Sequence, residues 1–243
     1  DVEVVASSKD RNYSYLPTGY AIPENAAYFH YTTNNTIEGT QMGDIPSTPV
    51  PLIADMSSDV LSCGMDFNRF SFIYAGAQKN IGAAGVNLVV ADKDFLATGN
   101  TAIPSMMDYR QHVANGSMLN TPPVFAIYVC LLTLRWLKKI GGIPAIEKIN
   151  EQKANLLYTT LASLPMFNLP VPSQDRSKMN AVFTMHDPAL EKLFLTRCKE
   201  EGMIGIKGHR SVGGFRVSMY NAMPLSSVVD ITDLIKDFAN KHA

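Results

Sequence analysis

The sequence lacks most of the features that would indicate a class of function directly. Its 243 residues include three cysteines, Cys63, Cys130 and Cys198, whose spacing matches no metal-ligand motif. Cys130 lies in an apolar helical run, so we expect reduced structural thiols, no metal site and a reducing, cytoplasmic compartment. The net charge of -1, from 21 basic and 22 acidic side chains, creates no field that would attract nucleic acid or an anionic membrane. Any anion-binding site must therefore be local.

Long apolar runs are also absent. The longest, 124–134, is well short of the ~20 residues that a bilayer requires, and no signal peptide is visible. A hydrophobic content of 46% still allows a substantial core, in one large domain or two smaller ones. The chain opens on an apolar run at 1–5 that predicts a strand already under way, and this indicates the interior of a longer protein.

The pattern of short apolar runs predicts a sheet followed by a second, smaller domain. The predicted strands of the first part are 28–32, 52–54, 71–74 and 86–90. Several are almost continuously apolar, which is typical of strands covered by helices on both faces. Helices are predicted at 122–139, capped by Thr121, and at 144–164, with a domain boundary near Lys138. The remainder predicts a small α+β domain from strands at 179–185 and 215–220 and helices at 188–201 and 225–243.

Two residues at the ends of predicted strands suggest a particular chemistry. Lys79 follows a buried strand and is flanked by the small residues of 75–77 and 82–85, so its ammonium is partly desolvated and easily deprotonated, as an imine-forming lysine needs. Asp55 ends another apolar run, where α/β sheets present groups to ligands. Its carboxylate could keep a pyridine nitrogen protonated, so the pair suggests pyridoxal phosphate chemistry. The plainer interpretations are a solvated lysine and a capping aspartate.

A glycine-rich segment, 208–216, carries two arginines and a histidine. Arginine forks bind carboxylates or phosphates bidentately, so the segment indicates a double anion site. His209 beside Arg210 favours a phosphate, and Arg216, which opens a predicted strand, is better fixed to orient a carboxylate. A surface turn with solvated arginines explains the same residues equally well.

Polar turns supply the remaining candidates. Thr36 lies in a turn after a predicted strand, where its hydroxyl suits a cofactor's phenolic oxygen or phosphate, and Gln78 could donate to a phosphate. Asn120 and Thr121 precede a predicted helix and are typical capping residues. From the residues alone, each of these could be a turn or cap residue and nothing more.

Five segments together carry a family resemblance. They are TNNTIEG at 33–39, IADMSSDVLS at 53–62, YAGAQKNIGAAG at 74–85, LNTPP at 119–123 and KGHRSVGGFRVSMYNAMP at 207–224. The sequence resembles the phosphoserine aminotransferases essentially end to end. The resemblance implies an α/β fold of type I among pyridoxal phosphate enzymes, with a mixed-sheet cofactor domain, incomplete here, at 1–138 and a smaller C-terminal α+β domain at 139–243.

The resemblance also assigns roles. It implies that Lys79 binds pyridoxal 5'-phosphate, that Asp55 pairs with its ring nitrogen, and that Thr36 and Gln78 contact it. Asn120 and Thr121 match residues that reach the cofactor of the neighbouring subunit in a homodimer with active sites at the interface. Arg216 matches the binder of the substrate α-carboxylate, and His209 with Arg210 matches part of the site for the substrate phosphate.

The activity implied is transamination between L-glutamate and 3-phosphohydroxypyruvate, which gives O-phospho-L-serine and 2-oxoglutarate in serine biosynthesis. The family is also connected with pyridoxine biosynthesis. Roughly the N-terminal third of the family's chain is absent, and with it a phosphate-cradling loop, a ring-stacking tryptophan and a His-Arg pair. We therefore expect this chain to be incomplete: a proteolysed product, a part of the whole chain, or one piece of a nicked protein that keeps the missing N-terminal segment as a separate piece. The alternatives are a lyase or desulfurase of the same fold type, or a non-catalytic fragment that folds without cofactor.

Overall fold

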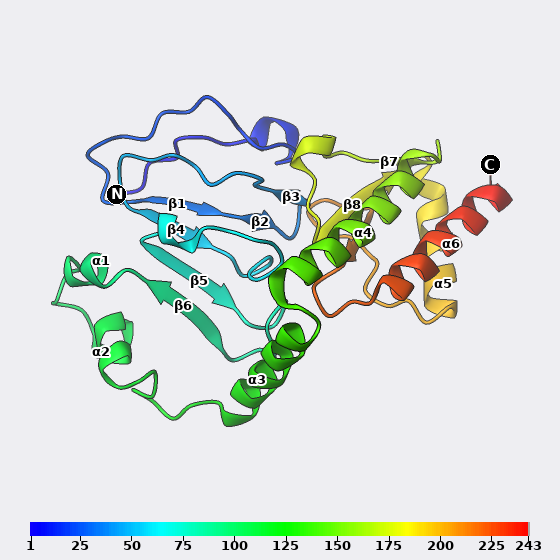
Figure 1. Cartoon of the computed structure of the whole chain (residues 1–243). Helices are drawn as coiled ribbons and strands as arrows, with labels where there is room; N and C mark the ends of the chain where they lie inside the picture. The colour runs from blue at the N-terminus through cyan, green and yellow to red at the C-terminus, as the bar shows by residue number, and fades with distance from the viewer. Residues whose placement is uncertain (243) are drawn as a thin grey trace.

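The computed structural model describes residues 1–242 as two units joined through helices α3 and α4 (Figure 1). The first unit holds a four-stranded sheet in the order β1-β4-β5-β6, in which β6 alone is antiparallel to its neighbour. Its strands are β1 (Phe29–Thr32), β4 (Leu52–Asp55), β5 (Phe72–Gly76) and β6 (Asn87–Ala91). After β6 come α1 (Lys93–Ala97), α2 (Tyr109–Ala114) and α3 (Val124–Lys139). The mixed sheet confirms the expected α/β class.

The register of the parallel strands brings their carboxyl ends to one edge. Thr32, the last residue of β1, lies opposite Asp55, the last residue of β4, and Asp55 lies opposite Tyr74 of β5. Because parallel strands present the loops after them at the same edge, the segments after β1, β4 and β5 become neighbours. This edge faces the second unit (Figure 1).

Close packing fixes the loop after β5 against α3. The buried side chains of this unit include Leu52, Ala54 and Ile73 from the sheet and Cys130 from α3. A Cβ atom at Gly82 would lie 2.3 Å from Cys130 Sγ and 3.0 Å from Cys130 Cα. Only glycine therefore lets the loop after β5 lie this close to α3.

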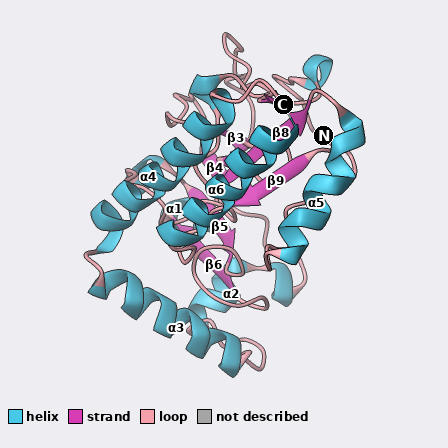
Figure 2. Cartoon of the chain, turned by 90° about the vertical axis from the view of Figure 1, so that its right-hand side faces the viewer, coloured by secondary structure: helices cyan, strands magenta, loops and turns pink. Residues whose placement is uncertain are grey.

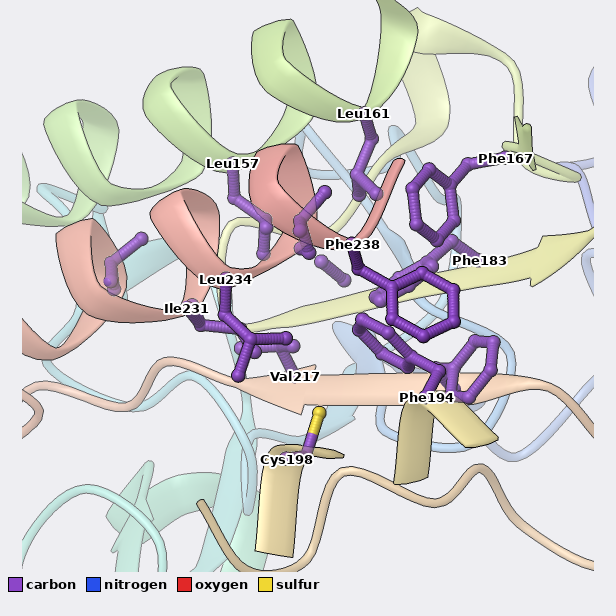
Figure 3. Packing of buried hydrophobic residues seen from close by; sticks show 14 of the residues in the cluster. Leu157, Leu161, Phe167, Phe183, Phe194, Cys198, Val217, Ile231, Leu234 and Phe238 are labelled. Atoms are coloured by element: carbon purple, nitrogen blue, oxygen red, sulfur yellow. The ribbon is translucent and has the colours of Figure 1, made fainter. Parts of the chain in front are cut away.

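The second unit is an antiparallel sheet in the order β7-β8-β9 packed against helices (Figure 2). Its elements are α4 (Gly142–Ala162), β7 (Phe167–Asn168), β8 (Asn180–Met185), α5 (Glu191–Glu200), β9 (Phe215–Ser218) and α6 (Leu225–His242). The buried residues of α6 recur at helical spacing, at Val228, Ile231, Ile235 and Phe238, and this stripe faces the core. Figure 3 shows the resulting cluster, in which the Phe194 and Phe238 rings pack edge to face at 5.1 Å.

The structure corrects three local predictions. Residues 1–5 are not a strand, and Val2 and Val4 are exposed, because no neighbouring strand pairs with them. The predicted cap at Thr121 is wrong, because α3 begins at Val124 and its first turn has no side-chain cap. The polar turn after β1 contains a small hairpin, β2 (Asn34–Asn35) paired with β3 (Thr40–Gln41).

Two separate hydrophobic cores support a domain division. One cluster draws its buried residues from 31–130 and the other from 154–239. We retain the boundary near Lys138 as a proposal, because α3 ends at Lys139 and α4 begins at Gly142. Within the described residues, 1–242, no helix is both long and apolar enough to span a bilayer.

Candidate active site

The candidate site lies where the loops after β1, β4 and β5 meet. Thr33 N donates to Asp55 O at 3.0 Å, and Met56 N donates to Tyr74 O at 2.8 Å. Gly76 N donates to Ser57 Oγ at 3.0 Å. These hydrogen bonds tie the three loops together, so the groups that they carry have fixed relative positions.

Lys79 enters this site from a tight turn after β5. Ile81 N and Gly82 N both donate to Ala77 O, at 3.1 and 2.8 Å, and this closes the turn. The Lys79 side chain is half-buried, and its Nζ donates to Thr36 Oγ1 at 2.6 Å. Sequence positions 36 and 79, which belong to different predicted turns, are therefore in contact.

Arg216 reaches the same threonine from the second unit. Arg216 is the second residue of β9, and its Nη1 lies 3.4 Å from Thr36 O. Its Nε is buried without a hydrogen-bond partner among residues 1–242. Within the same residues neither Lys79 nor Arg216 forms an ion pair. Two cationic groups that converge without an acidic partner make a site for an anion.

Asp55 lies at the end of β4, whose following loop is hydrogen-bonded to the loops after β1 and β5. Its Oδ1 accepts a hydrogen bond from Ser57 N at 2.8 Å, so the carboxylate closes the turn after β4. The same carboxyl interacts with Tyr74 on the neighbouring strand β5: burial, the Asp55 charge and a side-chain hydrogen bond to Asp55 raise the pKa of the Tyr74 hydroxyl.

A second carboxylate, Asp59, lies four residues after Asp55. Asp59 is buried, its Oδ1 accepts from Thr33 Oγ1, and its Oδ2 accepts from Gln41 Nε2 at 3.2 Å. Burial raises the pKa of Asp59 to about 6, although both hydrogen bonds oppose the shift. No sequence pattern marks this residue, because its burial depends on the β2–β3 hairpin.

Asp59→Asn is expected to stabilise the protein at pH 7 and to remove part of its pH dependence. A carboxyl whose folded pKa is raised from 3.8 to about 6 stabilises the fold below pH 3.8, and that contribution is lost as the pH rises to about 6. The asparagine amide can donate to Thr33 Oγ1 and accept from Gln41 Nε2. From the size of the pKa shift, we expect the free energy of unfolding to rise by up to about 3 kcal/mol at pH 7 and to change very little at pH 4.

Urea unfolding at both pH values measures this difference, with Asp44→Asn as the control because Asp44 is exposed. A stability change that is the same at pH 4 and pH 7 would contradict the assignment of Asp59 as the titrating group.

The loop that carries His209 and Arg210 is a closed glycine turn. Gly208 N donates to Gly214 O at 2.8 Å, and a Cβ atom at Gly208 would lie 2.0 Å from Gly213 O. Ser211 N donates to His209 Nδ1 at 3.3 Å, so the neutral ring carries its proton on Nε2 and can donate it to an anion. Arg210 is exposed. No hydrogen bond within residues 1–242 joins this loop to Lys79, Asp55 or Thr36.

Three predicted residues form no hydrogen bond to Lys79, Thr36 or Arg216 among residues 1–242. Gln78 is exposed and folds back over β5, where a Cβ atom at Gly76 would lie 2.7 Å from Gln78 Oε1. Asn120 and Thr121 are exposed on the segment before α3, and the Asn120 amide makes only a 3.4 Å contact with Thr121 O. Within the described residues neither contacts the loops of the site, so their roles stay predictions.

The comparisons with known proteins agree with this geometry. The family model described as Aminotransferase class-V matches residues 1–230, so the chain belongs to the class-V aminotransferases. The phosphoserine aminotransferase of Flavobacterium johnsoniae is 51% identical over 98% of this chain and 67% of its own length. That of Porphyromonas gingivalis is 48% identical over 100% of this chain and 68% of its own length. Within the family the chain thus stands with the phosphoserine aminotransferases, and it spans about two thirds of the relatives that it matches.

Solved structures give the same result. Phosphoserine aminotransferase from Bacillus circulans subsp. alkalophilus superposes with a TM-score of 0.97 at 40% identity, over 100% of this chain and 68% of that chain. The PLP-bound phosphoserine aminotransferase of Trichomonas vaginalis gives a TM-score of 0.92 at 36% identity, over 97% of this chain and 68% of that chain. The expected fold type is therefore confirmed, and the named relatives are aminotransferases rather than lyases or desulfurases.

Proposed function

We propose that the chain is part of an enzyme that transfers the amino group of L-glutamate to 3-phosphohydroxypyruvate and forms O-phospho-L-serine and 2-oxoglutarate. One observation carries the proposal. Lys79 Nζ and the Arg216 guanidinium converge on Thr36 in a chain that is 51% identical to a phosphoserine aminotransferase. Both substrates have an α-carboxylate and a reacting α-carbon. Arg216 can bind the α-carboxylate of either substrate, and the Lys79 amine can act at its α-carbon.

The residues present fit pyridoxal 5'-phosphate, the cofactor of the family. The half-buried Lys79 offers an amine beside Thr36, and Asp55 offers a carboxylate at the end of β4. When bound, the cofactor supplies an electron-withdrawing ring that stabilises negative charge at the substrate α-carbon. Lys79 would hold the cofactor covalently, Asp55 would pair with its ring nitrogen, and Thr36 and Gln78 would donate to its oxygens.

When it is not bonded to the cofactor, Lys79 Nζ would carry the proton that the reaction moves. A free amine can take a proton from the substrate α-carbon and return it elsewhere, as general base and then general acid. Thr36 Oγ1, 2.6 Å from Nζ, orients the amine for this transfer. Arg216 fixes the α-carbon through the α-carboxylate, because its buried Nε needs a hydrogen-bond acceptor.

His209 and Arg210 give the site its substrate range. One pair of donors can bind the phosphate of 3-phosphohydroxypyruvate or the side-chain carboxylate of glutamate, since both groups present anionic oxygens that accept hydrogen bonds. A phosphate carries more charge and more acceptor atoms than a carboxylate, so the binding of the phosphorylated substrate depends more strongly on His209 and Arg210.

Arg210→Ala tests the proposed function directly. We expect the KM for 3-phosphohydroxypyruvate to rise at least ~10-fold, the loss of one charge-assisted contact, while an amino donor of the alanine type is affected far less. Steady-state kinetics on the cofactor-loaded protein measures this, with Arg197→Ala on α5 as the control because Arg197 pairs only with surface glutamates. Equal losses for both kinds of substrate would mean that Arg210 has only a structural role.

We further propose a homodimer. Large apolar side chains along α3 are exposed, among them Val124 and Phe125 at 72% and 77%, and an apolar surface of this kind is usually covered by a partner. Asn120 and Thr121 lie just before this helix, so in a dimer packed there they could reach the cofactor phosphate of the second copy.

Location in the cytoplasm is proposed from Cys63, Cys130 and Cys198, which are all free thiols. A role in pyridoxine biosynthesis is proposed from the family resemblance.

A further inference from the structure

Five asparagines are buried among the described residues, and all of them lie between the two units. Asn34, Asn80, Asn150, Asn180 and Asn221 are each 3% exposed or less. We call this set the asparagine junction. Burying an amide costs free energy unless its donors and acceptors are paired, so such a cluster indicates a demand for fixed geometry.

The first connection runs from the loop after β1 to β9. Asn34 Nδ2 donates to Ser58 Oγ at 2.8 Å and to Asn180 Oδ1 at 2.9 Å. Asn180 Nδ2 donates in turn to Ser218 Oγ and Tyr220 Oη, both at 3.1 Å. Asn34 lies two residues before Thr36, and Ser218 lies two residues after Arg216. This connection therefore joins the Thr36 loop to the strand that carries Arg216.

The second connection runs from the Lys79 turn to the end of β9. Asn80, which follows Lys79, accepts at its Oδ1 from Asn221 N at 3.0 Å. Asn221 Nδ2 donates to Leu61 O at 3.0 Å, and Asn221 Oδ1 accepts from Asn150 Nδ2 at 2.9 Å. The turn that presents Lys79 and the segment after Arg216 are thus bonded to each other.

Lys153 secures the segment after β9 from the other side. Its side chain is fully buried in α4, and Nζ donates to the carbonyls of Met219, Tyr220 and Met223 at 2.9, 3.0 and 3.1 Å. All three N–H groups of the ammonium donate to main-chain carbonyls, so Lys153 has a structural role and no hydrogen left for a ligand. It holds Asn221 in place for the second connection.

We propose that the asparagine junction consists of positioning residues that set the distance between Lys79 and Arg216, and so the fit of the substrate α-carboxylate to the reacting α-carbon. The inference depends on the proposed function for the identity of the substrate. A shift of about 1 Å in such a pair can lower the rate ~100-fold, which explains why rigid amide connections would be retained here.

Asn180→Ala is the test variant, because it removes the hydrogen bonds of the Asn180 side chain to Asn34, Ser218 and Tyr220 and leaves Lys79 and Arg216 in place. The matched control is Leu161→Ala, which also lowers stability because it removes a buried side chain in the core of the second unit, but it breaks no hydrogen bond of the junction. Arg216→Lys serves as the reference for a damaged carboxylate site. A double variant, Ser218→Ala with Tyr220→Phe, removes only the acceptors of Asn180 Nδ2 and covers the case in which Asn180→Ala does not fold.

The readout is the affinity of the cofactor-loaded protein for glutarate, an unreactive dicarboxylate, by isothermal titration calorimetry. We expect Asn180→Ala, or the double variant, to weaken glutarate at least ~10-fold and to lower kcat/KM for glutamate in parallel, and Leu161→Ala to change neither more than ~2-fold. An Asn180→Ala protein that behaves like Leu161→Ala would overturn the inference and leave the proposed function intact. If Arg216→Lys also leaves glutarate affinity unchanged, the proposed function itself is wrong.

Discussion

Lys79→Ala is expected to lower transamination by at least ~10³-fold, because it removes both the amine that would hold the cofactor and the group that would move the proton. The effect should exceed that of any other single replacement in the chain. Lys79 is the one amine that the structure places at Thr36 Oγ1, 2.6 Å away, whereas the other buried lysine, Lys153, is fully used by three carbonyls. No neighbouring lysine is therefore placed to substitute for it.

Two measurements separate the roles of Lys79. Reduction of the cofactor-loaded protein with borohydride, followed by proteolysis and mass spectrometry, should leave the cofactor mass on the peptide that contains Lys79. In Lys79→Ala the visible absorption band of the bound cofactor should disappear, while the control Lys207→Ala, at an exposed position, keeps it. Cofactor mass found on a peptide with Lys153 instead would show that the lysine is misassigned.

Much of the candidate site could be predicted because strand ends are visible in a sequence. Lys79, Thr36 and Arg216 come from three unrelated patterns, namely a strand-end lysine, a polar turn and an arginine that opens a strand. The structure brings all three within hydrogen-bonding distance. For Thr36 and Lys79 the reason is topological, since the carboxyl ends of the parallel strands β1, β4 and β5 gather at one edge whatever the side chains are. Arg216 lies on β9 of the antiparallel sheet, so its contact with Thr36 depends on the packing of the two units.

The asparagine junction and Asp59 could not be predicted, because their burial depends on contacts between distant segments. Asn34 and Asn180 are 146 positions apart, and each lies in a stretch where asparagine usually marks a turn. Asp59 becomes buried only when the β2–β3 hairpin covers it, and that hairpin has strands of two residues. Such short strands have no periodicity to detect.

The incorrect local predictions have the same physical origin. An alternating apolar run such as 1–5 has strand propensity, but a strand exists only when a partner supplies its hydrogen bonds. Thr121 has the chemistry of a cap, yet two prolines follow it and the helix starts only at Val124. Propensity is a weak constraint where tertiary contacts or neighbouring prolines decide.

Arg216→Lys is expected to lower kcat/KM about 100-fold for L-glutamate and for 3-phosphohydroxypyruvate alike, because both substrates present an α-carboxylate to this residue. Lysine keeps the positive charge but loses the fork that lets Nε and a terminal nitrogen bind two carboxylate oxygens together. The buried Nε of Arg216 has no hydrogen-bond partner among residues 1–242, so it is the donor that a carboxylate would satisfy. The remaining nitrogen, Nη1, is already directed at Thr36 O.

The pattern of losses, more than their size, distinguishes Arg216 from Arg210. Arg210→Ala should affect mainly the phosphorylated substrate, whereas Arg216→Lys should affect both half-reactions equally, which steady-state kinetics with each substrate in turn will measure. Arg69→Lys is the matched control, since Arg69 is exposed and donates only to Pro46 O at 3.3 Å. A loss confined to 3-phosphohydroxypyruvate would place Arg216 at the phosphate and not at the α-carboxylate. The two halves of the anion site would then have to be exchanged, with the α-carboxylate held by the His209–Arg210 loop.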